Sequence, residues 1–166
     1  FLPFCCDPSI HKKVTLTRQE KDKYAADVTF VGQWNAPRQK LLETLGEFDI
    51  KVFGPGWRKR VKKNSPLYAR VFAPVYIDEL AKLYSASRIV LNIHLWYGSF
   101  THGVNMRLFE ASGCAAFQLA DYQKQIPDMF EPGKEIITFS NEAQLKDLVK
   151  SFLEDAESAS RIGDAS

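Results

Sequence analysis

The sequence has few cysteines, no long apolar run and almost no net charge. Its three cysteines, Cys5, Cys6 and Cys114, cannot all pair within one chain, so we expect a reducing, cytoplasmic setting. No apolar run approaches the ~20 residues that a membrane-spanning helix needs. The net charge of +2 argues against an extended basic surface. We therefore expect neither a nucleic-acid partner nor a membrane span.

The sequence also lacks the motifs of common nucleotide enzymes. Residues 32–38 contain no three-glycine dinucleotide fingerprint, and Gly54 and Gly56 are not followed by a third glycine. No Gly-Lys-Ser or Gly-Lys-Thr phosphate loop occurs. His94 and His102 have no cysteine or carboxylate at the usual spacing of metal ligands. Nicotinamide chemistry, ATP hydrolysis and a metal site are therefore disfavoured.

Length and composition predict one globular domain. A chain of 166 residues buries roughly 70% of its unfolded surface without disulfides or metals. The apolar fraction of 45% and the charged fraction of 25% are typical of such domains. Because the chain starts without Met, we interpret it as part of a longer protein. We expect a connecting segment at 1–26, the domain at 27–155 and a tail at 156–166.

Strands and helices alternate along the predicted domain. Apolar runs predict six strands, at 27–32, 48–53, 70–73, 89–93, 114–119 and 135–139. Apolar residues at helical spacing predict helices at about 35–45, 78–86 and 123–130, after Asn105, and from Asn141 towards the tail. This alternation is typical of a doubly wound, Rossmann-like α/β sandwich with about six parallel strands.

In such a sheet, ligands bind beyond the carboxyl ends of the strands, near the switch in strand order. The rule selects the loops at 32–35, 54–57, 73–75, 92–105 and 120–122. The helix that follows Asn105 would present free backbone N–H groups and the positive end of its dipole. The dipole contributes about 0.3–2 kcal/mol with a charged ligand. An anion is therefore the ligand that this helix start favours.

Three charged side chains near these helix starts are candidates for the same site. A charge-assisted hydrogen bond from Arg107 would contribute ~1.5–3 kcal/mol, and Arg38 has a similar place in the first predicted helix. For each arginine, a solvated position on the helix is the alternative. Glu110 lies three residues after Arg107, where it can accept both hydroxyls of a ribose or form a local ion pair with Arg107.

Two further features stay open. His102 lies in a loop flanked by glycines, where it is either a donor to phosphate or sugar or simply an exposed residue. The basic run at 58–63 is either a solvated loop or a region that attracts an anionic substrate. The three tryptophans, Trp34, Trp57 and Trp96, are more often packing residues than ligand platforms, although two of them follow strand ends.

Five segments combine into a specific pattern. They are Val-Gly-x-Trp-Asn-x-x-Arg at 31–38, Gly-Pro-Gly-Trp at 54–57, the run at 79–94, Gly-Val-Asn-Met-Arg-Leu-Phe-Glu-Ala at 103–111, and Phe-Glu-Pro-Gly-Lys-Glu at 130–135. Together they resemble the C-terminal, donor-binding half of GT-B glycosyltransferases, and more narrowly the spore-maturation-protein-like branch of the family-1/family-4 enzymes. Phe-Leu-Pro-Phe-Cys-Cys-Asp-Pro at the start resembles the segment that joins the two halves in that branch.

The resemblance implies a domain that binds a nucleotide-diphospho-sugar, such as a UDP-, GDP- or dTDP-sugar, without a metal cofactor. It also implies an N-terminal acceptor-binding domain as partner. Glu110 matches the glutamate that holds the ribose, and His102 stands where the broader family has a glutamate that contacts the transferred sugar. We take His102, Arg107 and Glu110 as candidate catalytic residues. The candidate donor-binding residues are Gly32, Gln33, Trp34, Asn35, Arg38, Gly54, Gly56, Trp57, Ala73, Pro74, Val75, His94, Gly103, Val104 and Asn105.

The predicted function is therefore transfer of a sugar, of the hexosyltransferase type, from a nucleotide diphosphate to an unknown acceptor. The domain alone is expected to be inactive, because half of the cleft lies in the other domain. One alternative is an inactive nucleotide- or partner-binding module of the same fold, for which His102 in place of glutamate is the argument. The other is an oxidoreductase-type Rossmann domain, against which the missing glycine fingerprint speaks.

Overall fold

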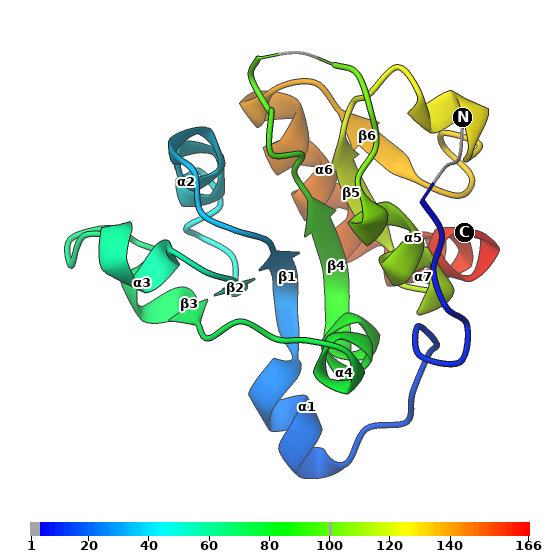
Figure 1. Ribbon diagram of the computed structural model, residues 1–166, viewed down its shortest axis with the longest axis horizontal. Helices are drawn as coiled ribbons and strands as arrows, with labels where there is room; N and C mark the ends of the chain where they lie inside the picture. Colours follow the sequence, from blue (N-terminus) through cyan, green and yellow to red (C-terminus); the bar gives the residue numbers. More distant parts are fainter. Residues whose placement is uncertain (1–3, 100) are drawn as a thin grey trace.

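The computed structural model describes residues 4–99 and 101–166. Residues 1–3 of the predicted connecting segment, and Phe100 in the loop before Asn105, lie outside the described residues. Within the described part, six strands form one parallel sheet in the order β3-β2-β1-β4-β5-β6 (Figure 1). The strands are β1 (Ala26–Val31), β2 (Ile50–Phe53), β3 (Val71–Phe72), β4 (Ser87–Asn92), β5 (Gln118–Asp121) and β6 (Ile137–Phe139). The doubly wound Rossmann-like α/β class is confirmed.

The switch in strand order lies between β1 and β4. Val28 in β1 is aligned with Ile50 on one side and with Ile89 on the other. The chain builds β2 and β3 outward from β1, then crosses back to place β4 on the opposite side. The carboxyl ends of β1 and β4 therefore flank the position where a ligand is expected in such a sheet.

Helices cover both faces of the sheet. They are α1 (Arg18–Tyr24), α2 (Ala36–Glu43), α3 (Trp57–Arg60), α4 (Asp78–Ala86), α5 (Met106–Gly113), α6 (Glu142–Glu154) and α7 (Ala156–Ala165), with 3₁₀ turns η1 (Tyr68–Arg70) and η2 (Ile126–Asp128). Apolar side chains of α2, α3, α6 and α7 form one core cluster with the sheet, and those of α4 and α5 form another. Among the described residues, no helix is long and apolar enough to cross a membrane.

Part of the predicted connecting segment is helical. Thr17 and Glu20 form a capping box at the start of α1: Thr17 Oγ1 accepts from the Glu20 amide at 3.3 Å, and Glu20 Oε2 accepts from the Thr17 amide at 2.8 Å. The buried Tyr24 then fastens α1 to α4, because its hydroxyl donates to Glu79 Oε1 at 2.6 Å. The spacing Thr-x-x-Glu was the available signal for this helix.

Several boundaries differ from the predicted ones, and the helix predicted at 123–130 is only the 3₁₀ turn η2. The fifth strand begins at Gln118 and not at Cys114, because Cys114 ends α5 and Ala115 adopts a positive φ of 51° that redirects the chain. Residues 156–165, expected as a tail, form α7. A Cβ built on Gly163 of α7 would lie 2.8 Å from both Ala115 O and Phe117 N, so this helix packs directly on the connection between α5 and β5.

Candidate functional site

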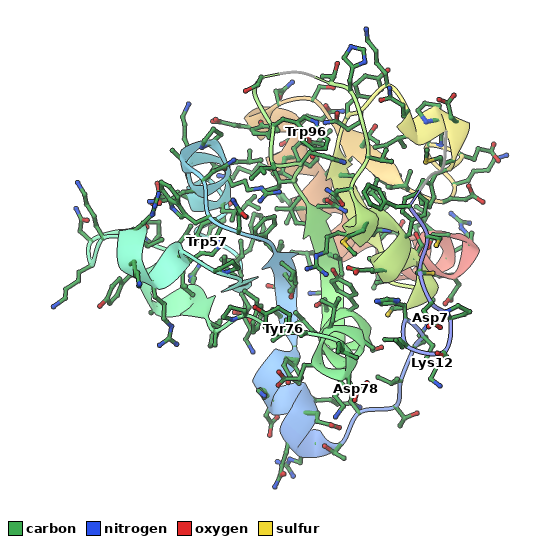
Figure 2. All side chains as sticks on the ribbon, in the orientation of Figure 1. Asp7, Lys12, Trp57, Tyr76, Asp78 and Trp96 are labelled. Carbon is green, nitrogen blue, oxygen red and sulfur yellow. The ribbon has the colours of Figure 1, made fainter. Side chains whose placement is uncertain are left out.

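The loops after β1 and β2 brace one another at the carboxyl edge of the sheet. Gly54 has φ of +147°, and a Cβ on it would lie 2.0 Å from Gly32 O, so only glycine fits. The indole N–H of Trp57, which is labelled in Figure 2, donates to the same oxygen at 2.7 Å. Trp57 is the first residue of α3 and is fully buried. Trp57 therefore has no surface for a donor. We reassign it from donor binding to support of the loop that carries Gly32.

The ring of Trp34 stacks against an arginine of the basic run at 58–63. The Arg60 guanidinium lies 4.4 Å from the centre of the Trp34 ring, and the Trp34 indole donates to Gln39 Oε1 at 2.6 Å. Residues 58–60, expected in a basic loop, belong to the short helix α3 and are exposed. These contacts hold Trp34 flat against α2 and α3.

Arg38 joins the two sides of the switch point. Its Nε donates to Ile93 O at 3.0 Å, its Nη2 donates to the same oxygen, and its Nη1 donates to Gln33 O at 2.9 Å. Burial lowers the pKa of this guanidinium to about 10, although the negative charge of Asp121 acts in the opposite direction and raises it. Arg38 is therefore not on a solvated surface. Its donors hold the backbone of the loops after β1 and β4.

A buried polar network follows the ends of β4 and β5. The His94 amide and Nδ1 lie 2.7 and 2.8 Å from Asp121 Oδ1, and His94 Nε2 accepts from the Asn105 amide at 3.3 Å. Gln123 Nε2 donates to Asp121 Oδ2 at 2.7 Å, and the Trp96 indole donates to Gln123 Oε1 at 3.0 Å. His94 is fully buried, so it cannot touch a donor as predicted. Asp121 lies in the predicted ligand loop at 120–122 but is not among the predicted site residues.

The start of α5 is open towards the carboxyl edge. Asn105 occupies the N-cap position as expected, but its side-chain oxygen accepts no hydrogen bond from a helix amide. Its Nδ2 instead donates to Asn92 Oδ1 at 2.9 Å. Gly103, with φ of +93°, donates its amide to Gln125 Oε1 at 2.7 Å and places the backbone against the Trp96 ring. Within residues 101–166, the first-turn amides of α5 thus receive no side-chain cap from Asn105. This is the positive end of the helix dipole.

Arg107 and Glu110 form the local ion pair that was one of the sequence alternatives. Arg107 Nη1 lies 2.5 Å from Glu110 Oε2, on a side chain of Glu110 that is only 7% exposed. His11 Nε2 lies 3.8 Å from the other carboxylate oxygen. A Cβ on Gly113 would meet His11 O at 2.8 Å, so the N-terminal segment lies directly along α5 (Figure 1).

The remaining candidates lie in exposed loops. His102 is exposed, and Val104, two residues later, is buried under η2. After β3, Ala73 is exposed and Val75 is buried. They are followed by Tyr76, which is 65% exposed (Figure 2). The loop at 73–75 is a predicted donor-binding loop. The exposed ring of Tyr76 beside it is not among the predicted site residues.

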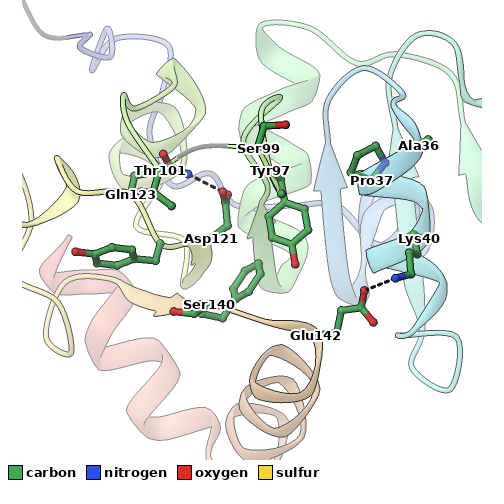
Figure 3. Close-up of a pocket in the computed structure, with 13 residues that line it drawn as sticks. Ala36, Pro37, Lys40, Tyr97, Ser99, Thr101, Asp121, Gln123, Ser140 and Glu142 are labelled. Carbon is green, nitrogen blue, oxygen red and sulfur yellow. Dashed lines mark hydrogen bonds and ion pairs between the residues drawn. The ribbon is translucent and has the colours of Figure 1, made fainter.

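A pocket of about 920 Å³ opens at the same edge, on the side of α2 and α6 (Figure 3). Lys40 and Glu142 form an ion pair of 3.3 Å at its rim, and Asp121 contributes to its wall. Its described lining is Ala36, Pro37, Lys40, Tyr97, Gly98, Ser99, Thr101, Asp121, Tyr122, Gln123, Phe139, Ser140 and Glu142. Since Arg107 and Glu110 are not among these, the pocket and the start of α5 are neighbouring but separate features.

Metal-ligand side chains are scattered. Across residues 4–99 and 101–166, no three His, Cys, Asp or Glu side chains gather closely enough to hold a metal ion. The cysteines are free thiols, with Cys5 exposed, Cys6 half-buried and Cys114 buried.

Comparisons with known proteins agree with this geometry. A family model described as glycosyl transferase-like matches residues 38–166. No curated protein sequence matches the chain significantly. Among solved structures, the C-terminal domain of the group 1 glycosyl transferase LpcC from Francisella tularensis has a TM-score of 0.69 at 15% identity, over 96% of this chain and 93% of that one.

Two longer proteins are equally similar. HepE of Anabaena, solved with UDP-glucose, has a TM-score of 0.71 at 14% identity, over 97% of this chain and 49% of its own. Sucrose-phosphate synthase from Thermosynechococcus elongatus has a TM-score of 0.70 at 15% identity, over 98% of this chain and 45% of its own. At such identities the likeness shows the fold alone, and the chain spans about half of each longer protein. By the family match, the chain belongs to the glycosyl transferase-like family, and its fold is that of the C-terminal domain of LpcC.

Proposed function

We propose that this chain is the donor-binding half of a transferase that moves a sugar from a nucleotide diphosphate to an acceptor held by a second domain. The start of α5 carries the proposal: this helix follows β4, a strand of the switch point, its N-cap Asn105 makes no side-chain cap, and Arg107 lies in its first turn. The membership of a transferase family supports it. So does HepE, a relative in fold that was solved with UDP-glucose.

In this proposal the diphosphate lies against the start of α5. The helix dipole contributes about 0.3–2 kcal/mol, and a hydrogen bond from Arg107 about 1.5–3 kcal/mol. Arg107 now pairs with Glu110, so a bound diphosphate would compete for its guanidinium. The start of α5 and Arg107 would both stabilise the negative charge that develops on the leaving diphosphate, and this stabilisation would accelerate the reaction.

The other parts of the donor would lie along the same edge. The loop at 32–35 would pass close to the diphosphate, and backbone groups of 73–75 would contact the base. Glu110 would hold the ribose through the carboxylate oxygen that faces His11. His102 and Gly103 would lie near the transferred sugar, opposite the acceptor of the missing domain.

We extend the proposal to the cofactor requirement and the location. The start of α5 and Arg107 supply the positive charge that a bound cation supplies in other transferases. Activity of the longer protein should therefore persist in EDTA. A cytoplasmic location, where nucleotide sugars would be available, stays a prediction.

Ligand-dependent melting of the chain tests the proposal. We expect UDP, GDP or dTDP at millimolar concentration to raise the melting temperature, since ligand at about 100 times its Kd adds about 2.7 kcal/mol of stability. Glu110→Gln, which keeps the volume of the side chain, should abolish most of the rise. Glu154→Gln, an exposed glutamate at the end of α6, is the matched control and should leave it unchanged. The proposal fails if no nucleoside diphosphate shifts the transition.

One alternative has a specific observation in its favour. The exposed His102 replaces an acidic residue that the resemblance leads one to expect, which would suit a module that binds nucleotide without catalysis. An assay of donor hydrolysis by the longer protein separates the two functions. Nucleotide binding with no turnover of any donor would favour the inactive module.

A further inference from the structure

The proton on His94 can be located from its partners. The Asn105 backbone amide can only donate, so His94 Nε2, 3.3 Å away, must accept and carries no hydrogen. Nδ1 therefore carries the hydrogen and donates to Asp121 Oδ1 at 2.8 Å. The same oxygen also accepts from the His94 amide at 2.7 Å. Asp121 thus fixes both the tautomer and the plane of the ring, as a carboxylate does for a histidine that acts through its other nitrogen.

Asn105, which receives this ring, is the residue at which α5 begins. Its backbone is held by His94 and its side chain by Asn92, both at the carboxyl end of β4. With its side chain engaged there, Asn105 gives no side-chain cap to the amides in the first turn of α5, while the Leu108 amide donates to its backbone oxygen at 3.4 Å. The direction in which those amides point is therefore set from the buried side by β4 and β5.

Polar and charged side chains from β5 and α2 surround the buried His94. Asp121 faces it from β5, and its second oxygen is taken by Gln123 at 2.7 Å. Arg38 of α2 supplies the opposing positive charge, since its guanidinium interacts with Asp121 and binds Ile93 O next to the ring. The Trp96 ring lies 5.1 Å from the imidazole. His94 is fully buried among these groups, so it acts through the groups that it bonds, Asp121 and Asn105, and of these Asn105 lies at the start of α5.

We infer that His94, oriented by Asp121, is a positioning residue that aims the start of α5 at a diphosphate. It does not touch the ligand. The inference rests on the proposed function for the identity of the ligand. The buried contact between His94 and Asn105 stands independently of it.

Two substitutions of His94 test its two ring hydrogen bonds separately. His94→Gln places an amide oxygen near the position of Nε2 and keeps an acceptor for Asn105. His94→Asn places its amide near the position of Nδ1, keeps the donor to Asp121 and removes the acceptor. The probes are UDP, GDP and dTDP, each compared with its nucleoside, and the readout is the ratio of the two Kd values.

For the diphosphate that binds, we expect His94→Asn to weaken its affinity about tenfold, which corresponds to 1.4 kcal/mol. That is the scale of leaving one buried donor unpaired. The nucleoside affinity should stay nearly unchanged, because the proposed contacts of the base at 73–75 and of the ribose at Glu110 do not involve Asn105. His94→Gln should restore most of the diphosphate affinity. Equal losses in both variants, or equal losses for nucleoside and diphosphate, would show that His94 only stabilises the fold and would overturn the inference.

Hydrogen exchange provides a readout without ligand. The Asn105 amide should exchange faster in His94→Asn than in the unsubstituted chain and stay protected in His94→Gln. Unchanged exchange in His94→Asn would overturn the inference even if nucleotides bind. If the unsubstituted chain binds none of the three diphosphates, the proposed function fails, while the exchange data still decide whether His94 holds the helix start.

Discussion

Two arginines that look equivalent in the sequence have different roles in the structure. Arg38 and Arg107 each lie in the first turns of a helix at the carboxyl edge of the sheet. Arg38 is buried, and its donors are used by Ile93 O and Gln33 O, so it shapes the loops of the site. Arg107 stays on α5 beside Glu110, where a ligand can compete for it. The two should therefore respond differently to substitution, with Arg38 affecting stability first and Arg107 affecting binding first.

At the same scale, Cys114 should be unreactive. Burial, together with the nearby Cys6 and Glu110, raises the pKa of its thiol to about 12. A raised thiol pKa means that the thiolate, which is the nucleophile, is almost absent at pH 8. We expect an aromatic disulfide reagent to modify the exposed Cys5 in the folded chain and to reach Cys114 only after unfolding in urea. Mass spectrometry of the modified chain measures this, with Cys5→Ser as control. Equal rates at Cys5 and Cys114 would contradict the prediction.

At the scale of elements, the site depends on the contact between the loops after β1 and β2. These loops approach so closely that Gly54 lies against the backbone of Gly32. Trp57 then closes the contact from the side of α3 by donating to Gly32 O. The loop at 32–35 is proposed to pass beside the diphosphate. Its position thus depends on contacts with the loop after β2 and not on its own residues alone.

Gly54→Ala should therefore be severely destabilising. The new Cβ would lie 2.0 Å from Gly32 O on a backbone with φ of +147°. We expect a loss of about 3 kcal/mol or more in the free energy of unfolding, measured by urea titration. Gly133→Ala is the matched control: its φ is +89°, but no described atom lies within 4 Å of the added Cβ. Its cost should be about 1 kcal/mol. Similar losses at both glycines would show that the contact between the loops is unimportant.

At the scale of the whole molecule, α7 completes the domain. Ala159 and Ile162 pack into the core cluster on the face of α2, α3 and α6. Gly163 lies against the backbone of the connection between α5 and β5. The last helix therefore covers the end of α5 that is farthest from the proposed diphosphate position, and stabilises the element on which the site depends.

Ending the chain after residue 155 should lower its stability substantially. The loss should be at least that of Ile162→Ala, about 2–5 kcal/mol for a buried isoleucine. Arg161→Ala, at an exposed position of the same helix, should stay within about 0.5 kcal/mol. Calorimetric melting of the three variants measures this. If the shortened chain melts at the temperature of the full chain, α7 is dispensable for the fold.

The features that depend on local pattern could be predicted. Alternating apolar runs determined the six strands and the doubly wound class, and the residues around Asn105 determined where α5 begins. The spacing of Arg107 and Glu110 was enough to foresee their ion pair as an alternative. Helix α1 escaped prediction although its capping box was present, because its polar surface obscured the single buried Tyr24.

The sequence by itself therefore determined the six strands, their doubly wound class and the helix start at Asn105, and it selected the carboxyl edge of the sheet for the candidate site. Tertiary structure alone decided which side chains there are exposed. Arg38 binds a carbonyl 55 residues away, and His94 binds Asp121 27 residues away. Trp57 binds an oxygen 25 residues away. Burial and hydrogen bonding at these positions are set by segments that meet only when the sheet forms, whereas helix starts and strand periods are set by neighbours in the chain.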